Sequence, residues 1–178
     1  MPDKTETKLV EAAVGGDIES FGKLCRRYYG PMVAIAYSVV SDHQLAEDAA
    51  QESFARALVS LRKLKKQTRF APWLAAICRN VAKDMVAAKA RRINAADLSQ
   101  AASGGSHNEN GILIRRAIER LPAAARELIV LRYYNNLSYE EIASVSGISP
   151  AAINGRLARA KRKMAKYLKQ NGFPESKL

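Results

Sequence analysis

Two carboxylates and an amide at helical spacing are the residues best suited to chemistry in this chain of 178 residues. Asp48, Gln51 and Glu52 fall three and four positions apart, so a helix would carry them on one face. Paired carboxylates can hold a divalent metal for nuclease chemistry, although no further ligand stands at a matching position. The same face could instead dock on a basic protein surface, or its acids could stabilise the positive end of a helix dipole. The pattern leaves the docking and dipole interpretations open.

Other potential metal ligands are few and scattered along the sequence. His43 and His107 are far apart, and neither Cys25 nor Cys78 belongs to a CxxC motif. We therefore expect buried free thiols, no metal and no cofactor. No apolar run approaches the roughly 20 residues of a membrane span, and the first residues lack the apolar core of a signal peptide. With 48% hydrophobic and 26% charged residues, the chain should be globular and cytoplasmic.

A helix-turn-helix pattern occupies residues 138 to about 168. Ser138 and Glu141 have the spacing of a capping box, which would start a short helix. Gly147 can end that helix in the left-handed conformation. Ser149, followed by a proline, then provides a capping side chain and a favoured first helical residue for the next helix.

The second helix of this pattern has one apolar and one cationic side. Its apolar residues recur at helical spacing and should pack inward: Ile153, Leu157, Ala160 and Met164. Its cations lie on the opposite side: Arg156, Arg159, Arg162, Lys163 and Lys166. Such a helix suits a DNA groove better than it suits an ordinary solvated surface.

The positive charge is concentrated at the two ends of the chain. Residues 1–92 hold 16 Lys and Arg against 10 Asp and Glu, a net charge of +6, and residues 112–178 have a net charge of +8. Residues 93–111 carry a net charge of −2 and are rich in Ser, Asn, Gly and Ala, which is typical of a flexible linker. Two basic blocks suggest two salt-sensitive contacts with a polyanion.

Apolar periodicity predicts an all-α fold. The spacing predicts helices over residues 5–14, 18–40, 44–65, 72–92, 112–120, 122–134, 139–145 and 150–169. Gly30-Pro31 should break or kink the second of these helices. Ser41 and Gln44 should form a capping box before the third, and residues 171–178 should fray.

Five segments follow one another in a distinctive order. They are LAEDAAQESF at 45–54, FAPWL at 70–74, ICRNVAKD at 77–84, LPAAARELIVLRY at 121–133 and LSYEEIA at 137–143. Together they resemble the extracytoplasmic-function (group IV) class of bacterial sigma factors, over about residues 15–92 and 112–168. The resemblance implies two helical domains, 1–92 and 112–178, joined by a linker at 93–111. It also implies a factor that is not itself an enzyme but recruits RNA polymerase and opens the promoter −10 region.

The resemblance gives the acidic face a partner. Asp48, Gln51, Glu52 and Phe54 lie where the family grips the clamp helices of the largest polymerase subunit, which favours docking over the dipole interpretation. The basic loop RKLKKQTRF at 62–70 matches the part of the family that captures a base flipped out of the −10 element. Cations and a pocket can offset the cost of unstacking that base.

The implied −10 contacts come from this loop and from the helix that follows it. They are Lys63, Lys65, Lys66, Arg69, Trp73, Asn80, Lys83 and Asp84. The loop cations would hold phosphates, and Asn80 can recognise a base edge. Trp73 could stack on a base or belong to the core.

The second helix of the helix-turn-helix should recognise the −35 element as duplex in the major groove. The implied contacts are Ser149, Asn154, Arg156, Arg159 and Arg162, with Arg156 and Arg159 chosen for guanine or phosphate. Family members commonly have a basic residue followed by Ser or Thr where this chain has Asn154-Gly155. The implied partners are core RNA polymerase, promoter DNA and an anti-sigma factor.

Two other classes of protein remain as alternatives. A stand-alone helix-turn-helix repressor or response-regulator output domain would use neither the acidic face nor the basic loop. A nuclease built on Asp48 and Glu52 would cleave DNA with magnesium. Stoichiometric binding to core polymerase separates both from a sigma factor.

Overall fold

The computed structural model describes residues 4–64, 66–95 and 109–174, and these residues contain helices and no strand, as predicted. The α-helices are α1 (Lys4–Val14), α2 (Ile18–Val40), α3 (His43–Ser60), α4 (Phe70–Ala95), α5 (Glu109–Glu119), α6 (Ala123–Ile129), α7 (Tyr139–Ser146) and α8 (Pro150–Gln170). Two 3₁₀ turns, η1 (Leu61–Lys63) and η2 (Gln67–Arg69), and a π-helical segment, η3 (Val130–Tyr134), connect them. None of the described helices combines the length and apolar character needed to cross a membrane.

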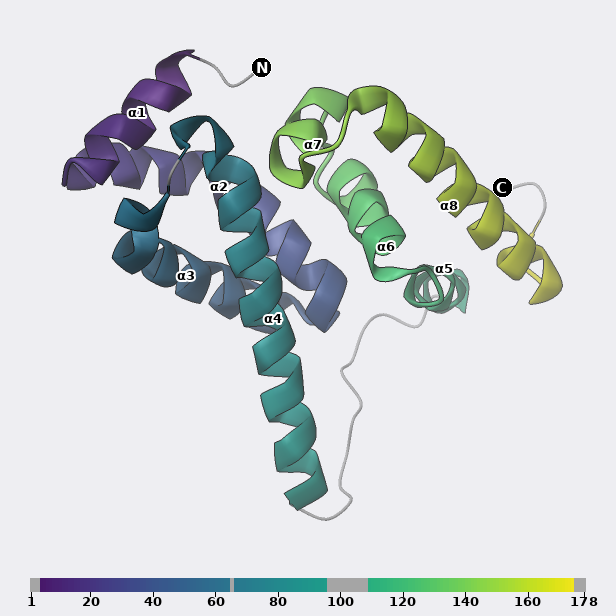
Figure 1. The fold of residues 1–178 in the computed structure, drawn as a ribbon. Coiled ribbons are helices and arrows are strands. Elements are labelled where there is room, and N and C mark those ends of the chain that lie inside the picture. Colours follow the sequence, from purple (N-terminus) through teal and green to yellow (C-terminus); the bar gives the residue numbers. More distant parts are fainter. Residues whose placement is uncertain (1–3, 65, 96–108, 175–178) are drawn as a thin grey trace.

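Helices α1–α4 form one bundle, which we call the N-terminal unit, and α2 packs against the other three helices (Figure 1). The large fully buried side chains of its interior include five on α2 and α4: Leu24, Met32, Ile35, Phe70 and Leu74. The C-terminal half of α4 extends beyond the rest of this bundle (Figure 1). In this half Lys83, Asp84 and Arg91 are exposed and available to a partner.

Helix α2 is continuous from Ile18 to Val40 through Pro31, so the helix is not broken at this proline, and a kink remains the other form of the prediction. Proline lacks a backbone N–H and so removes one hydrogen bond from a helix. Packing on three sides compensates for this loss, because α2 is the central helix of the bundle. The neighbouring Gly30 carbonyl also accepts a hydrogen bond of 3.3 Å from Nδ2 of Asn135.

Helix α3 begins and ends differently from the prediction. Asp42, not Ser41, is its capping residue, since the Asp42 carboxylate accepts a 3.0 Å hydrogen bond from the backbone N–H of Leu45. Ser41 instead takes a left-handed conformation with φ 56° that ends α2. The α-helix stops at Ser60 and gives way to the 3₁₀ turn η1. The basic stretch after Ser60 is therefore a compact loop rather than the last turn of a helix.

Helices α5–α8 form a second bundle, the C-terminal unit, in which α8 packs against α5, α6 and α7. The predicted helix at 122–134 is helical throughout but widens into a π-helix at η3, where the N–H of Asn135 bonds the carbonyl of Val130 at 3.2 Å. Helix α4 continues to Ala95 and α5 begins at Glu109, so both helices extend into the segment predicted as a linker.

The end of α8 is ordered as far as Phe173, which contradicts the predicted fraying of residues 171–174. Gly172 is left-handed with φ 80°, and the N–H of Phe173 bonds the carbonyl of Leu168 at 3.0 Å. These are the features of a Schellman motif. Phe173 is 7% exposed and packs against Ala117 of α5. Residues 175–178 lie outside the described residues.

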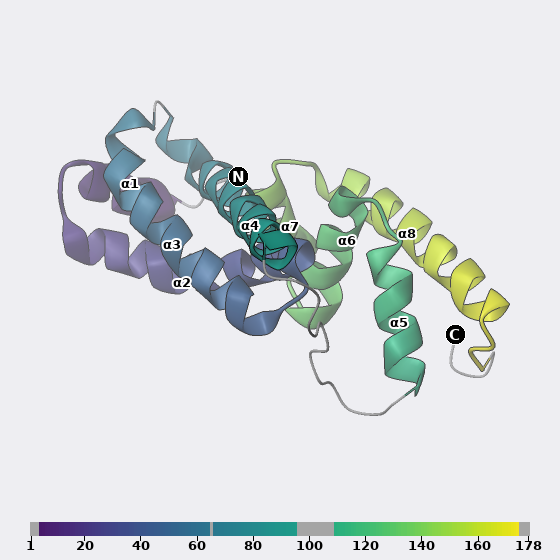
Figure 2. The same cartoon turned by 90° about the horizontal axis from the view of Figure 1, so that it is seen from below.

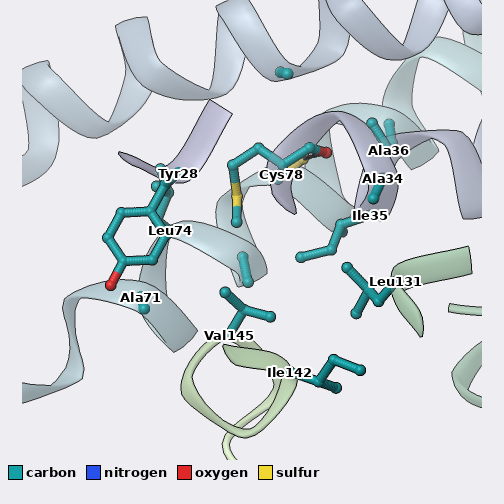
Figure 3. Packing of buried hydrophobic residues seen from close by; sticks show 14 of the residues in the cluster. Tyr28, Ala34, Ile35, Ala36, Ala71, Leu74, Cys78, Leu131, Ile142 and Val145 are labelled. Atoms are coloured by element: carbon teal, nitrogen blue, oxygen red, sulfur yellow. Dashed lines mark hydrogen bonds between the residues drawn. The ribbon is translucent and has the colours of Figure 1, made fainter. Parts of the chain in front are cut away.

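The two units share one hydrophobic core. Helix α4 packs against α7, and α2 packs against α6 and η3, and the units lie side by side in both views (Figures 1 and 2). Figure 3 shows Ile142 and Val145 of α7 pointing toward the side chains of α2 and α4. Both residues are at most 1% exposed. The contact between the units is therefore a packed apolar interface.

Candidate protein and nucleic-acid interfaces

The acidic face lies on the outer side of α3. Asp48 and Gln51 are exposed, and the Glu52 side chain is 43% exposed. The intervening residues Ala49 and Ala50 are fully buried against the bundle. Among the described residues there is no group of three or more His, Cys, Asp or Glu that could hold a metal ion. The geometry therefore offers an exposed acidic surface for a partner.

Phe54 is placed differently from the three polar residues of this face. It is 8% exposed and belongs to the main core cluster. A side chain this deeply packed can support the helix that carries the acidic face, but it presents almost no surface to a partner. Phe54 is therefore a core residue, unlike the solvent-facing Asp48, Gln51 and Glu52.

Arg56 pairs with two of the predicted site residues, a contact that our sequence analysis missed. Its Nε lies 2.7 Å from Oε1 of Glu52, and its Nη1 lies 3.4 Å from Oδ2 of Asp84 on α4. The hydrogen bond that Arg56 donates to Glu52 is the main cause that raises the pKa of Arg56. The spacing of Glu52 and Arg56 is that of a helical ion pair and could have revealed half of this contact. Arg56 joins the acidic face to the predicted −10 helix.

The basic loop between α3 and α4 is held by apolar anchors. Leu61, Leu64 and Phe70 are buried, while the predicted phosphate-binding residues between them are exposed: Lys63, Lys66 and Arg69. Lys65 lies outside the described residues. The loop therefore presents cations outward from a fixed base.

Trp73 stands at the start of α4 with its side chain half-buried. Its ring lies 5.9 Å from the ring of Phe70, inclined by 46°. Tilted aromatic pairs at this separation are favourable. One part of Trp73 thus packs in the core and another part remains open beside the loop.

The outward side of α4 carries the polar residues predicted for −10 contact. Asn80, Lys83 and Asp84 are exposed, whereas Leu74 and Val81 on the other side are at most 1% exposed. Between α3 and α4 lies a groove lined in part by Glu52, Val59, Ile77 and Asn80. The acidic face and the −10 helix therefore adjoin one another.

The helix-turn-helix has the local structure that its sequence predicts. The Ser138 hydroxyl accepts from the N–H of Glu141 at 3.1 Å, and the Glu141 carboxylate accepts from the N–H of Ser138 at 2.7 Å. Gly147 is left-handed with φ 71°. The Ser149 hydroxyl caps α8 by accepting from the N–H of Ala152 at 3.3 Å. The capping predictions for the helix-turn-helix are confirmed.

Helix α8 separates its apolar and cationic sides. Ile153, Leu157 and Ala160 are at most 2% exposed, whereas the predicted −35 residues on the other side are exposed: Ser149, Asn154, Arg156, Arg159 and Arg162. Asn154 is near Tyr139 of α7, with 3.5 Å between Oδ1 and the tyrosine hydroxyl. A cationic helix face of this form fits a major groove.

A second ion pair, between the two units, was also missed by sequence analysis. Nε and Nη2 of Arg79 lie 2.8 and 2.7 Å from the two carboxylate oxygens of Glu127. The side chains are 27% and 11% exposed, and the hydrogen bonds that Arg79 donates to Glu127 raise the pKa of Arg79. No local pattern could signal this pair, because its members stand 48 positions apart.

Both cysteines are free thiols, as predicted. Cys25 is half-buried, whereas Cys78 is fully buried and its sulfur lies 3.3 Å from the carbonyl of Met32. Burial raises the pKa of Cys78 to about 11. The Cys78 thiol is therefore protonated and unreactive at neutral pH.

Comparison with known proteins identifies both units. The family model "Sigma-70 region 2" matches residues 24–92, and "Sigma-70, region 4" matches residues 112–164. The ECF RNA polymerase sigma-E factor of Salmonella typhimurium is 32% identical over 174 residues, which cover 88% of this chain and 91% of that protein. The "Probable RNA polymerase sigma factor RfaY" of Xanthomonas campestris is 32% identical over 170 residues, which cover 89% of this chain and 42% of that protein.

A solved structure shares the fold. The sigma factor RpoE from Bartonella quintana, in complex with the anti-sigma factor NepR, matches with a TM-score of 0.55 at 23% identity, covering 85% of this chain and 98% of that one. The region 2 match contains the acidic face, the basic loop and most of α4, and the region 4 match contains the helix-turn-helix. The chain belongs to the sigma-70 family and is a sigma factor of the extracytoplasmic-function (ECF) type.

Proposed function

We propose that the acidic face of α3 is the surface by which this sigma factor binds core RNA polymerase. The observation that carries the proposal is the outward position of Asp48, Gln51 and Glu52 in a chain whose net charge is +12. Charge complementarity with a basic partner sets register and partner choice. Arg56 supports the face by holding Glu52 in place through the 2.7 Å ion pair. Phe54 contributes from the core.

The basic loop and α4 form the proposed −10 surface. A single strand needs cations for its phosphates and an aromatic or polar group for its bases, and the loop and α4 supply both. Lys63, Lys66 and Arg69 precede the half-buried Trp73, while Asn80 and Lys83 continue the surface along α4. Asp84 acts on this surface through its ion pair with Arg56. Lys65 stays a predicted contact.

Helix α8 is the proposed −35 surface. Its exposed Arg156 and Arg159 lie one turn apart, so both can enter the same groove. Ser149 and Asn154 lie nearer the N-terminus of the helix, where backbone N–H groups favour a phosphate. Arg162 lies further along the exposed side and is suited to the DNA backbone.

We infer further that 93–111 links two functional domains, 1–92 and 112–178. An anti-sigma factor is expected to control this chain as well, since a solved relative was captured with one. The factor should act in the cytoplasm, where its polymerase and promoters are. The polymerase, and not this chain, catalyses RNA synthesis.

The test is core polymerase binding by a variant with Asp48→Ala and Glu52→Ala. We expect stoichiometric binding to be lost in a pull-down while the helical circular dichroism stays native, because both side chains are on the surface. The matched control is Glu11→Ala with Glu19→Ala, which removes two exposed carboxylates from α1 and α2 and should leave binding intact. Retained binding by the α3 variant would refute the docking assignment. A stand-alone repressor would bind polymerase in none of these forms.

A further inference from the structure

One arginine contacts both the proposed polymerase surface and the proposed −10 surface. Arg56 is the only Lys or Arg in the sequence of α3. Its Nε lies 2.7 Å from Oε1 of Glu52 on the acidic face, and its Nη1 lies 3.4 Å from Oδ2 of Asp84 on α4. A single guanidinium is therefore shared between two carboxylates that belong to two different surfaces.

The pair between Arg56 and Glu52 can be exchanged without disturbing the core. The Arg56 side chain is 49% exposed, and the Glu52 side chain is 43% exposed. Exposed ion pairs within one helix contribute little to stability, because water competes for both groups. A cation on a bound protein can therefore replace Arg56 at Glu52 while α3 stays folded.

Asp84 is unfavourable to DNA unless its charge is offset. Its side chain is 69% exposed, and it follows Lys83 on the proposed −10 surface, where a carboxylate repels phosphates. In the free chain Arg56 offsets this charge only in part, since its shorter contact, 2.7 Å against 3.4 Å, is with Glu52. Once released from Glu52, Arg56 keeps Asp84 as a partner and has further N–H donors for a phosphate.

A groove brings Arg56 to the residue proposed to recognise a base. Both Arg56 and Asn80 line the groove between α3 and α4, together with the apolar side chains of Val59 and Ile77. A guanidinium can donate two parallel hydrogen bonds to a phosphate. A strand whose base meets Asn80 would thus place its backbone near a cation that is suited to hold it.

We propose that Arg56 is a further residue of the −10 surface and that it changes partners when polymerase binds. In the free chain Arg56 is held mainly by Glu52. A basic group of the polymerase takes over Glu52, and the released guanidinium then neutralises Asp84 and holds a phosphate of the −10 strand. Arg56 links polymerase binding to strand binding by a local exchange within the N-terminal unit. This inference rests on the proposed function, which assigns Glu52 to the polymerase and α4 to the strand.

Neutralising Glu52 in the free chain imitates the polymerase and tests the exchange. The probe is a labelled pool of random single-stranded DNA, measured by fluorescence anisotropy. Glu52→Gln should raise the affinity about threefold, the size expected for the release of one exposed ion pair. The matched control is Glu47→Gln, which removes the same charge from the same helix at a side chain that is also 43% exposed. Equal gains from the two variants would show a general effect of charge and would overturn the proposal.

The gain must also depend on Arg56. In a chain that already carries Arg56→Gln, the additional change Glu52→Gln should raise single-strand affinity no more than Glu47→Gln does, because no guanidinium is left to be released. Circular dichroism should show native helical content in every variant, since all three side chains are on the surface. A full gain without Arg56 would refute the exchange.

The holoenzyme gives the second measurement. Arg56→Gln should still bind core polymerase stoichiometrically in a pull-down, since it removes no carboxylate from the acidic face. It should initiate about threefold less from a library of genomic promoters, because one exposed charge contact is lost. The control is Arg26→Gln, at an exposed arginine of α2, which should initiate like the parent.

Equal initiation by the variants at Arg56 and Arg26 would overturn the proposal. A parent chain that fails to bind core polymerase would instead refute the proposed function. The free-chain affinities, which need no polymerase, would then still decide whether Arg56 exchanges its partners.

Discussion

The two proposed nucleic-acid surfaces of this sigma factor present their cations in different ways. Helix α8 is a continuous helix from Pro150 to Gln170, capped by Ser149 and closed by Phe173. The loop from residue 61 to residue 69 contains two 3₁₀ turns, η1 and η2, and is anchored by the buried side chains of Leu61 and Leu64. The helix fixes its cations at regular spacing, whereas the loop fixes only the base from which its cations project.

This difference matches the two forms of DNA that a sigma factor meets. A duplex presents a groove of constant width, so a rigid helix can place several side chains at once. A separated strand has no fixed shape and is better bound by cations around an aromatic group. Each prediction below tests whether the −35 surface depends on the helix α8 and the −10 surface on the anchored loop.

The largest effect should come from removing the anchor of the loop. Phe70 is fully buried, and its ring lies 5.8 Å from that of Tyr28 and 5.9 Å from that of Trp73. Phe70→Ala should lower the free energy of unfolding by about 3–5 kcal/mol, because it removes a core ring and leaves a cavity. Urea denaturation measures the change.

The control for this prediction is Val59→Ala on α3, where the side chain is 87% exposed. This change should alter the free energy of unfolding by less than about 0.5 kcal/mol. A loss at Phe70 as small as the loss at Val59 would show that the loop does not depend on its aromatic anchor.

A smaller effect should separate the two surfaces by the DNA that they bind. Arg156→Ala with Arg159→Ala should weaken binding of −35 duplex by about 1–3 kcal/mol for each lost base contact. Binding of single-stranded DNA should not change, because these arginines are on α8 and not in the loop. Fluorescence anisotropy with labelled duplex and labelled single strand measures both affinities.

The reciprocal variant is Lys63→Ala with Lys66→Ala. It should weaken single-strand binding and reduce the slope of log affinity against log salt by about 0.7 for each lost phosphate contact. Duplex binding should be retained. The division of roles between helix and loop would be wrong if both variants weakened both forms of DNA equally.

The caps of the helix-turn-helix could be predicted because each depends on a few neighbouring residues. Ser138 and Glu141 satisfy one another across three positions, and Gly147 needs only its own freedom at positive φ. The outward cations of α8 follow from periodicity in the same way. Local chemistry was therefore enough to predict the caps of the helix-turn-helix and the outward cations of α8.

Features that join distant residues could not be predicted in this way. The pair of Arg79 and Glu127 closes only when two helices from different units meet. The end of α8 depends on Phe173 finding Ala117 of α5, and α2 passes through Pro31 because its neighbours hold it on three sides. Tertiary packing overrode the local signals for fraying and for a helix break.

The smallest effect concerns Gly155 within the recognition helix. A Cβ added there would lie 3.7 Å from Nη1 of Arg159, which is ordinary contact, so alanine fits. Gly155→Ala should stabilise the protein by about 1 kcal/mol, because glycine is a poor helix former, and it should leave −35 duplex affinity unchanged. Thermal unfolding and duplex titration measure the two quantities.

Gly22 of α2 provides a matched control, since a Cβ there would lie 3.8 Å from Nη1 of Arg26, four residues further along the helix, as Arg159 is from Gly155. Gly22→Ala should stabilise the protein to a similar degree and cannot touch DNA bound at α8. If Gly155→Ala stabilised the chain as Gly22→Ala does but lost duplex affinity, the DNA backbone would have to approach α8 at Gly155. The −35 surface would then depend on the shape of its helix as well as on its arginines, and the contrast with the loop would become sharper.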